Sequence, residues 1–145
     1  MTNCGLCLAY NEDNRVIFRN EDAVSVVITN PLNEGHLLIM PRRHVLQLDD
    51  LTADESRAVN ELLYQSQQRL ADRFPQTPPV LGMNYGRHST QPHIHYQLFP
   101  SDATLRKLYA AAHKPSELVS LPVDLALVRP DCTSESLDKM VAKLR

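Results

Sequence analysis

Residues 91–99 constrain the fold of this chain more than any other stretch, because polar and apolar side chains alternate strictly along it. The polar positions are His93, His95 and Gln97, and the apolar positions are Ile94, Tyr96 and Leu98. A period of two predicts a β-strand that carries two imidazoles and a carboxamide in a row on one face, spaced about 6.5–7 Å apart. Pro92 suits the first position of a strand. The alternative is a surface strand with two solvated histidines and no metal.

Four other runs rich in β-branched and apolar residues predict the remaining strands of a sheet. They are residues 16–19, 23–29, 36–40 and 80–85. A polar turn separates the first two runs, and a loop rich in Asn, Pro and Gly (residues 30–35) separates the second from the third. With residues 91–99, these runs predict about five strands.

The main helix is predicted for residues 52–74. Thr52 and Glu55 form a capping box at its start, and Pro75 ends it. Apolar residues recur at helical spacing along one face, which indicates packing against a core: Val59, Leu62, Leu63, Leu70 and Phe74. Further on, residues 102–112 and 134–144 predict helices, and residues 118–128 predict one or two strands.

Composition limits the classes of protein to consider. A chain of 145 residues with 43% hydrophobic content can bury one core and is short for two domains. The net charge of −2, without a basic run, argues against an extended nucleic-acid surface but leaves a small anionic ligand open. The absence of long apolar runs and of signal-peptide features near the first residues predicts a cytoplasmic protein without a membrane association.

The pair Cys4-x-x-Cys7 has three interpretations. A redox pair is expected after a strand and at the start of a helix, yet only three residues precede this one. Two thiolates at this spacing also form half of a zinc site, with two ligands to come from elsewhere. The third interpretation is an incidental pair of thiols. Cys132 stands apart and is expected to be a plain, buried or half-buried thiol.

Two further groups of polar residues lie at the ends of predicted strands. His36 and His44 flank the strand at residues 36–40, and each alone is more typical of a surface or capping histidine. The loop 86–90 leads into the histidine strand and offers backbone N–H groups, the hydroxyls of Ser89 and Thr90, and the guanidinium of Arg87. These groups could cradle a phosphoryl group, although the loop lacks the glycine spacing of the common phosphate-binding loops.

The order of these pieces resembles the histidine-triad superfamily of nucleotidyl hydrolases and transferases. The resemblance covers roughly residues 4–100 and rests on Cys4-x-x-Cys7, on the segment from Gly35 to His44, and on the segment from Asn84 to Pro100. The hydrolase branch has a third histidine where this chain has Gln97. The pattern H-x-H-x-Q is therefore similar to the branch of galactose-1-phosphate uridylyltransferases and dinucleoside-polyphosphate phosphorylases, whose members are much longer.

The resemblance implies a structural zinc ion. In that transferase branch, two cysteines, a histidine after the third strand and the first triad histidine bind the metal. The matching residues here are Cys4, Cys7, His44 and His93. Four sulfur and nitrogen ligands complete a closed tetrahedral site, which suits a structural role and would join the N-terminus to the active strand. A metal-free set of the same residues is the alternative, and no organic cofactor is expected.

The resemblance also implies roles for the remaining site residues. His95 matches the nucleophile, which would attack the α-phosphorus and form a nucleotidyl-histidine intermediate. Gln97 would donate hydrogen bonds to a phosphoryl oxygen, because a carboxamide cannot act as a general acid. His36, Asn84, Ser89 and Thr90 match positions near the phosphate or ribose, and Asn30 is a further candidate for ribose contact. We add Arg87 from its charge and location.

The sequence thus predicts an α+β fold: an antiparallel sheet of about five strands with one main helix packed on it and a C-terminal helical extension. Residues 1–100 would form the catalytic domain, and residues 101–145 an extension packed on it. The predicted function is a nucleotidyl transferase or hydrolase that acts on nucleoside-phosphate compounds, and the resemblance implies a homodimer. The alternatives are a non-catalytic nucleotide-binding or interaction protein, and a zinc-stabilised scaffold without a nucleotide role.

Overall fold

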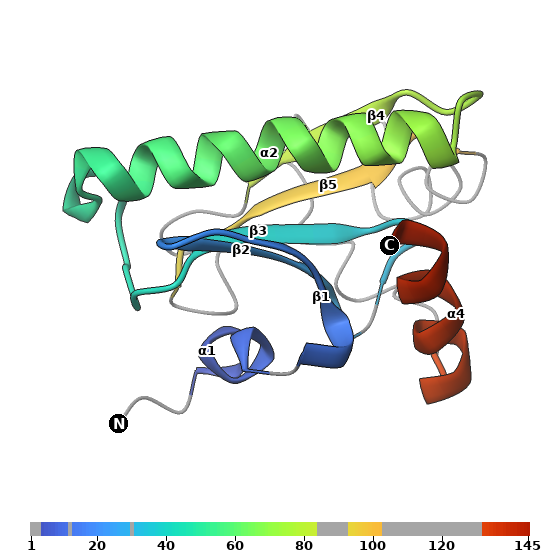
Figure 1. The fold of residues 1–145 in the computed structure, drawn as a ribbon, viewed down its shortest axis with the longest axis horizontal. Helices are drawn as coiled ribbons and strands as arrows, with labels where there is room; N and C mark the ends of the chain where they lie inside the picture. The colour runs from blue at the N-terminus through green and yellow to red at the C-terminus, as the bar shows by residue number, and fades with distance from the viewer. Residues whose placement is uncertain (1–3, 12, 30, 84–92, 103–131) are drawn as a thin grey trace, which may run out of the picture.

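The computed structural model describes residues 4–11, 13–29, 31–83, 93–102 and 132–145. Its centre is a five-stranded antiparallel sheet with the strand order β1-β2-β3-β5-β4 (Figure 1). The strands are β1 Val16–Arg19, β2 Ala23–Val27, β3 Leu37–Pro41, β4 Pro79–Gly82 and β5 Tyr96–Pro100. The predicted α+β fold is confirmed.

The register between β2 and β3 divides the core into two halves. Val24 lies opposite Met40 and Val26 opposite Leu38, and all four belong to one apolar cluster. Ala23 and Val27 of β2, with Leu37 and Ile39 of β3, belong to a second cluster. Because successive side chains point to opposite faces, each strand supplies both clusters. All ten residues of the two strands are buried, so this sheet is covered on both faces.

The first face is covered by α2 (Ala53–Arg73), as the helical stripe predicts. The Thr52 side chain accepts a hydrogen bond from the Glu55 backbone N–H, and the Glu55 side chain accepts one from the Thr52 N–H. This confirms the capping box. One polar contact crosses the apolar layer, a 2.8 Å hydrogen bond between the hydroxyls of Ser25 and Ser66.

The helix α4 (Ser134–Leu144), predicted from the sequence, packs into the same core through Met140, Val141 and Leu144. Arginines of α2 hold its C-terminal end: Arg69 donates to the carbonyls of Leu144 and Arg145, and Arg73 Nε donates to the Lys143 carbonyl at 2.8 Å. The helix predicted for residues 102–112, apart from its first residue, and the strand segment predicted for 118–128 lie outside the described residues.

The second face carries a short helix that the sequence analysis did not predict, α1 (Gly5–Tyr10). In Figure 1 it lies on the opposite side of the sheet from α2. Leu6 and Ala9 pack into the apolar cluster of that face, and Cys4 stands at the N-cap. Two single-turn 3-10 helices, η1 (Asp13–Arg15) and η2 (Leu48–Asp50), complete the described elements. None of the helices in the described part of the chain has the length and apolar character needed to span a bilayer.

The histidine strand is shorter than predicted. β5 begins at Tyr96, so His93 and His95 lie in the segment that leads into it. The reason is a contact with the loop after β3: the Ile94 N–H donates to the Val45 carbonyl at 2.8 Å, outside the ladder between β3 and β5. The predicted row of three polar side chains on one strand is therefore wrong for the two histidines and holds for Gln97.

A glycine fixes the entrance to β3. Gly35 has φ = +96°, a conformation that L side chains rarely adopt. A Cβ at this position would lie 2.9 Å from Phe74 Cε2 and 2.9 Å from Pro100 Cγ. The chain can therefore turn into β3 beneath α2 only with glycine here.

Candidate functional site

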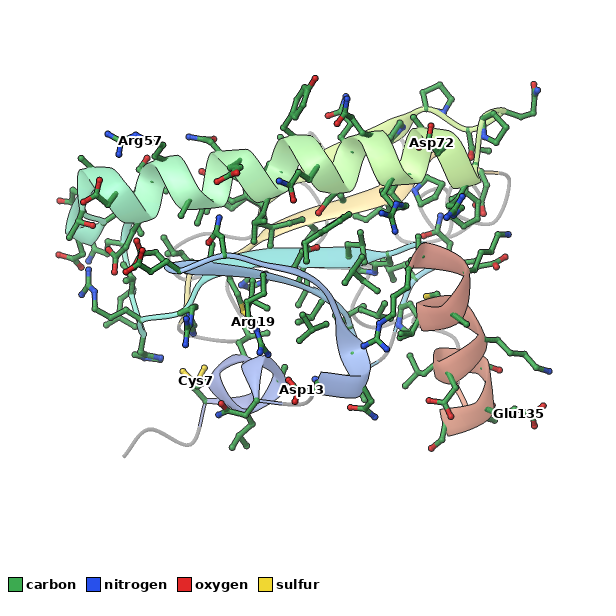
Figure 2. The ribbon with its side chains drawn as sticks, in the orientation of Figure 1. Cys7, Asp13, Arg19, Arg57, Asp72 and Glu135 are labelled. Atoms are coloured by element: carbon green, nitrogen blue, oxygen red, sulfur yellow. The ribbon has the colours of Figure 1, made fainter. Side chains whose placement is uncertain are left out.

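Four potential metal ligands meet on the sheet face opposite α2. The Sγ atoms of Cys4 and Cys7 and ring nitrogens of His44 and His93 lie within 4.8 Å of one another. Cys7 Sγ is 3.3 Å from His44 Nδ1 and 3.4 Å from His93 Nδ1, and Cys4 Sγ is 3.8 Å from His93 Nδ1. Figure 2 shows the Cys7 sulfur beside α1. Three separate segments thus bring together the set that the sequence predicted.

The hydrogen bonding of His93 prepares its ring for a metal. Its Nε2 lies 2.9 Å from the Pro41 carbonyl, and because a carbonyl can only accept, Nε2 carries the proton. The lone pair then lies on Nδ1, which faces the two thiols. Burial lowers the pKa of His93 to about 4, so the imidazole is neutral at pH 7. A neutral ring that is oriented through its other nitrogen is the usual form of a ligating histidine.

The spacing of these donors fits a single tetrahedral ion. Zn–S bonds of about 2.3 Å and Zn–N bonds of about 2.0–2.1 Å place neighbouring ligand atoms about 3.3–3.8 Å apart. The three close donor pairs span 3.3 to 3.8 Å. Cys4 and His93 are almost completely buried, so an ion here would be enclosed by protein. These four residues could hold a metal ion, and their chemistry suits a structural one.

His95 lies next to this cluster and is joined to it through the backbone. Its Nδ1 is 2.8 Å from the carbonyl of His93, so Nδ1 carries the proton and Nε2 carries the lone pair. The side chain is 6% exposed. His93 therefore has two functions here: its ring faces the potential metal site, and its carbonyl fixes the tautomer of His95, the predicted nucleophile.

Gln97 and His36 form a second bonded pair on this face. Gln97 lies opposite Leu38 in the ladder, which places its side chain on the face of α1. Its Oε1 accepts a 2.9 Å hydrogen bond from His36 Nε2, because His36 Nδ1 accepts from the Leu32 N–H at 3.1 Å. This hydrogen bond fixes the orientation of the Gln97 carboxamide. His36 contacts the oxygen of the carboxamide and not its NH2 group.

The structure describes the surroundings of His36, while its predicted contact with the substrate stays a prediction. Its side chain is fully buried, and both ring nitrogens bond to protein groups. Through Nε2, His36 holds the Gln97 side chain. No local pattern could have revealed this, because the two residues are 61 positions apart. The other predicted ligand contacts, Asn30, Asn84, Arg87, Ser89 and Thr90, lie outside the described residues.

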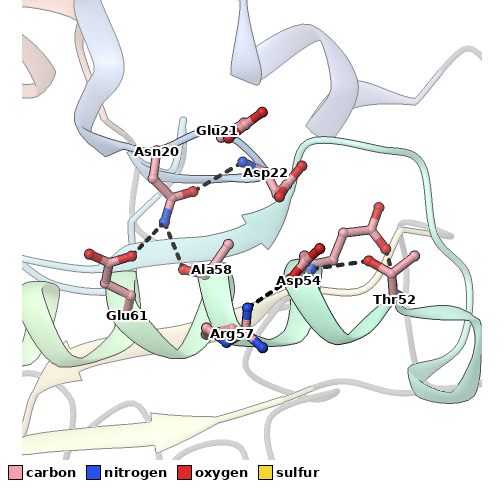
Figure 3. A pocket seen from close by; sticks show the side chains of 9 residues that line it. Asn20, Glu21, Asp22, Thr52, Asp54, Arg57, Ala58 and Glu61 are labelled. Carbon is pink, nitrogen blue, oxygen red and sulfur yellow. Dashed lines mark hydrogen bonds and ion pairs between the residues drawn. The ribbon is translucent and has the colours of Figure 1, made fainter.

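A separate cavity of about 660 Å³ lies at the start of α2 (Figure 3). Five of its lining residues are acidic: Glu21, Asp22, Asp54, Glu55 and Glu61. Arg57 also lines it and pairs with Asp54 at 2.7 Å. A lining with this excess of carboxylates repels phosphate groups, so the cavity is unsuited to a nucleotide.

The sequence model of the HIT domain family matches residues 10–104, about two thirds of the chain. The protein belongs to the HIT domain family. A curated relative, a bis(5'-nucleosyl)-tetraphosphatase [asymmetrical] of Schizosaccharomyces pombe, is 28% identical over 88 residues, which are 59% of this chain. The match covers 48% of that relative, so this HIT protein spans about half of its length.

Solved structures of HIT proteins share the fold. A histidine triad nucleotide-binding protein from Sulfolobus tokodaii superposes with a TM-score of 0.70 at 16% identity, over 97% of this chain and 89% of that one. A zinc-bound histidine triad family protein from Mycobacterium smegmatis gives a TM-score of 0.64 at 17% identity, over 98% and 93% of the two chains. At these identities the likeness establishes the fold alone.

Proposed function

We propose that this HIT protein cleaves nucleoside-phosphate compounds such as dinucleoside polyphosphates, with His95 as the nucleophile and water as the final acceptor. The observation that carries the proposal is the hydrogen bond from His95 Nδ1 to the His93 carbonyl, which leaves the lone pair on Nε2. Membership of the HIT domain family and the similarity to a bis(5'-nucleosyl)-tetraphosphatase support the choice of substrate.

The first step forms a bond between His95 Nε2 and the α-phosphorus, while the bond from that phosphorus to the bridging oxygen breaks. The electron pair of the broken bond leaves with the departing polyphosphate. Nδ1 keeps its proton throughout and donates a 2.8 Å hydrogen bond to the His93 carbonyl. That contact also stabilises the positive charge that the ring acquires in the nucleotidyl-histidine intermediate.

In the second step, water attacks the same phosphorus, its proton passes to the solvent, and the P–N bond breaks. The nucleoside monophosphate leaves, and the electron pair returns to His95 Nε2. Gln97 acts in both steps as a neutral hydrogen-bond donor: with Oε1 occupied by His36, its NH2 group can bind a phosphoryl oxygen as negative charge develops.

The Cys4–Cys7–His44–His93 cluster would hold a structural zinc ion. Bound there, the ion would join α1 to the segments of the other two ligands and would supply no chemistry to the reaction. The protein's own contribution is the orientation of His93, through its hydrogen bond to the Pro41 carbonyl.

A second candidate function is nucleotidyl transfer to an acceptor other than water. The specific observation in its favour is Gln97, because a carboxamide can neither give a proton to a leaving group nor take one from water. Sugar phosphates or inorganic phosphate as acceptors would then give nucleotide sugars or nucleoside diphosphates as products.

The test is product analysis with diadenosine tetraphosphate in the presence and absence of inorganic phosphate. The proposal expects a nucleoside monophosphate and a nucleoside triphosphate, with turnover at least about a thousand-fold lower in His95→Ala. Nucleoside diphosphate formed only when phosphate is added would favour the transferase. Equal turnover in wild type and His95→Ala would refute both candidates.

A further inference from the structure

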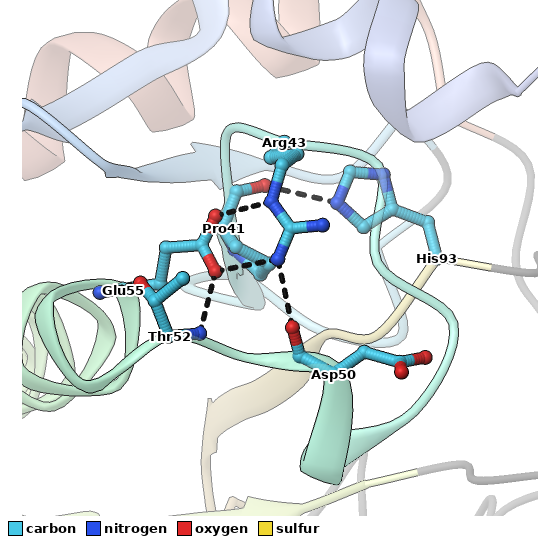
Figure 4. A network of polar contacts seen from close by, with 6 residues as sticks. All are labelled: Pro41, Arg43, Asp50, Thr52, Glu55 and His93. Carbon is cyan, nitrogen blue, oxygen red and sulfur yellow. Dashed lines mark hydrogen bonds and ion pairs between the residues drawn. The ribbon is translucent and has the colours of Figure 1, made fainter.

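An ion pair between Arg43 and Glu55 joins the first turn of α2 to the residue next to His44, one of the predicted metal ligands. Arg43 Nε lies 2.6 Å from Glu55 Oε1, and Arg43 Nη2 lies 2.8 Å from Glu55 Oε2 (Figure 4). The same Nη2 donates to the Asp50 carbonyl at 2.8 Å. The Arg43 guanidinium therefore joins three places. They are the start of the loop that follows β3, the end of that loop at Asp50, and the first turn of α2 at Glu55.

The geometry of this pair separates it from an ordinary surface contact. It is bidentate, and the Glu55 side chain is only 8% exposed, although Arg43 is half exposed. The Glu55 carboxylate also accepts a 2.9 Å hydrogen bond from the Thr52 N–H. The hydrogen bonds from Arg43 lower the pKa of Glu55 to about 2, against the opposing effect of burial, so the carboxylate is charged at pH 7.

The residues next to Arg43 in the chain hydrogen-bond to the segment 93–95, which contains the proposed nucleophile His95 (the catalytic segment). The Pro41 carbonyl accepts from His93 Nε2 at 2.9 Å, and the Val45 carbonyl accepts from the Ile94 N–H at 2.8 Å. His44, between them, places its Nδ1 3.3 Å from Cys7 Sγ. Every one of these contacts depends on the path of residues 41–45, and Arg43 is the central residue of that segment.

We infer that the Arg43–Glu55 pair is a positioning device: it fixes residues 41–45 so that His44 and His93 converge on one metal ion and the segment 93–95 is held for catalysis. Its contribution to the metal ligands rests on the metal site proposed above. Its contribution to the segment 93–95 does not, because the Ile94 and His93 hydrogen bonds are accepted by the backbone carbonyls of Val45 and Pro41 and involve no ligand atom of the metal site.

The competing explanation is that Glu55 serves only as the capping residue of α2. The two roles share Glu55 Oε2, which accepts from both Arg43 Nη2 and the Thr52 N–H. They are separable because capping also uses the Thr52 hydroxyl and does not involve Arg43. Thr52→Ala removes the hydroxyl that caps the Glu55 N–H and leaves the carboxylate contacts in place. Glu55→Gln and Arg43→Lys instead disrupt the charged, bidentate contact and leave the Thr52 hydroxyl in place.

The experiment compares Glu55→Gln and Arg43→Lys with Thr52→Ala as the matched control for loss of helix capping. Zinc affinity is measured by competition with a chromophoric chelator, and the ligand field is followed by the visible absorption of the Co²⁺-loaded protein. We expect affinities about 10- to 100-fold weaker in the first two variants, with an altered Co²⁺ spectrum. Thr52→Ala is expected to stay within about threefold of the wild type. Equal affinities in Glu55→Gln and Thr52→Ala would overturn the positioning of the metal ligands.

A second measurement uses the metal-free protein and does not depend on the metal site. It follows hydrogen exchange of the Ile94 amide, whose acceptor is the Val45 carbonyl. Exchange about tenfold or more faster in Glu55→Gln than in Thr52→Ala would support the positioning role. Equal exchange would overturn it for the catalytic segment. A wild type that binds neither zinc nor cobalt would refute the proposed metal site and the metal part of this inference, while Ile94 exchange would still decide the other part.

Discussion

The two faces of the sheet are built on opposite principles. Toward α2, the contacts between sheet and helix are almost all apolar, and they involve side chains that differ little in chemistry. Toward α1, the site consists of cysteine, histidine and glutamine side chains, each of which makes at least one directed polar contact. The same strands serve both faces, because alternate residues of β2 and β3 belong to different clusters.

The difference shows that the two faces depend on different kinds of interaction. Burial of apolar area is non-directional, so the α2 face tolerates exchanges of similar volume. Hydrogen bonds fix directions, so on the α1 face one atom determines the role of the next: the Pro41 carbonyl sets the tautomer of His93, and the His93 carbonyl sets that of His95. Variants on the two faces should therefore fail in different ways.

The largest expected effect is removal of the ion from the zinc-loaded protein. With free zinc at a thousand times its dissociation constant, binding to the folded state contributes about 4 kcal/mol to the free energy of unfolding. Thermal unfolding with and without a strong chelator should show this loss, together with faster amide exchange in α1. An unchanged melting temperature would mean that the α1 face is held without a metal, as the α2 face is.

Leu62→Ala should show what the apolar face contributes. Leu62 lies on α2 and is 1% exposed, and truncation of such a leucine typically costs about 2–5 kcal/mol. Urea unfolding of the variant should show a loss in this range, while zinc affinity stays unchanged. Tyr64→Ala, on the exposed side of the same helix, is the matched control and should cost less than about 1 kcal/mol. A large loss of zinc affinity in Leu62→Ala would show that the two faces are not separable.

Gln97→Ala should show what the polar face contributes. Removal of the donor to a developing phosphoryl charge is expected to lower turnover by about a hundred-fold. His36→Ala should lower it less, since the carboxamide remains and loses only its fixed orientation. Steady-state kinetics on both variants, normalised to the folded fraction, test this order. A larger loss in His36→Ala would assign the direct role to the histidine.

The smallest effect concerns pH. The pKa of Glu55 is lowered from 4.5 to about 2 in the folded protein, so the stabilisation is complete above about pH 4.5 and is lost as the pH falls toward 2. Because Arg43 is half exposed, we expect only about 1–2 kcal/mol from this pair. Urea unfolding at pH 7 and pH 3.5 should show a smaller difference in Glu55→Gln than in wild type. If the unfolding free energy changed equally between the two pH values in both proteins, the Glu55 carboxylate would not be the source of the pH dependence.

Patterns within short segments were sufficient to predict the α2 face. The capping box at Thr52 and the helical apolar stripe predicted α2, and runs rich in β-branched and apolar residues predicted the strands on which it packs. The six-residue helix α1 was missed, because so short a segment carries little periodicity. The start of β5 was placed too early, because the Ile94–Val45 hydrogen bond joins residues far apart in the sequence.

The site could be predicted only from the family resemblance and from the types of residue present. Cys4, Cys7, His44 and His93 do come together, as predicted. The partnership of His36 with Gln97 and the ion pair of Arg43 with Glu55 depend on how distant segments pack, and no local spacing encodes them. The homodimer and the cytoplasmic location stay predictions, as do the ligand contacts of the residues outside the described part of the chain.

The measurement that tests the central claim most directly is the intact mass of the protein after rapid quenching with diadenosine tetraphosphate. Wild type should gain the mass of one adenylyl group, carried on His95, and the adduct should decay in water at a rate consistent with turnover. His95→Ala should show neither the adduct nor the products. Turnover by wild type without any adduct, or an adduct that persists in His95→Ala, would contradict nucleophilic catalysis by His95.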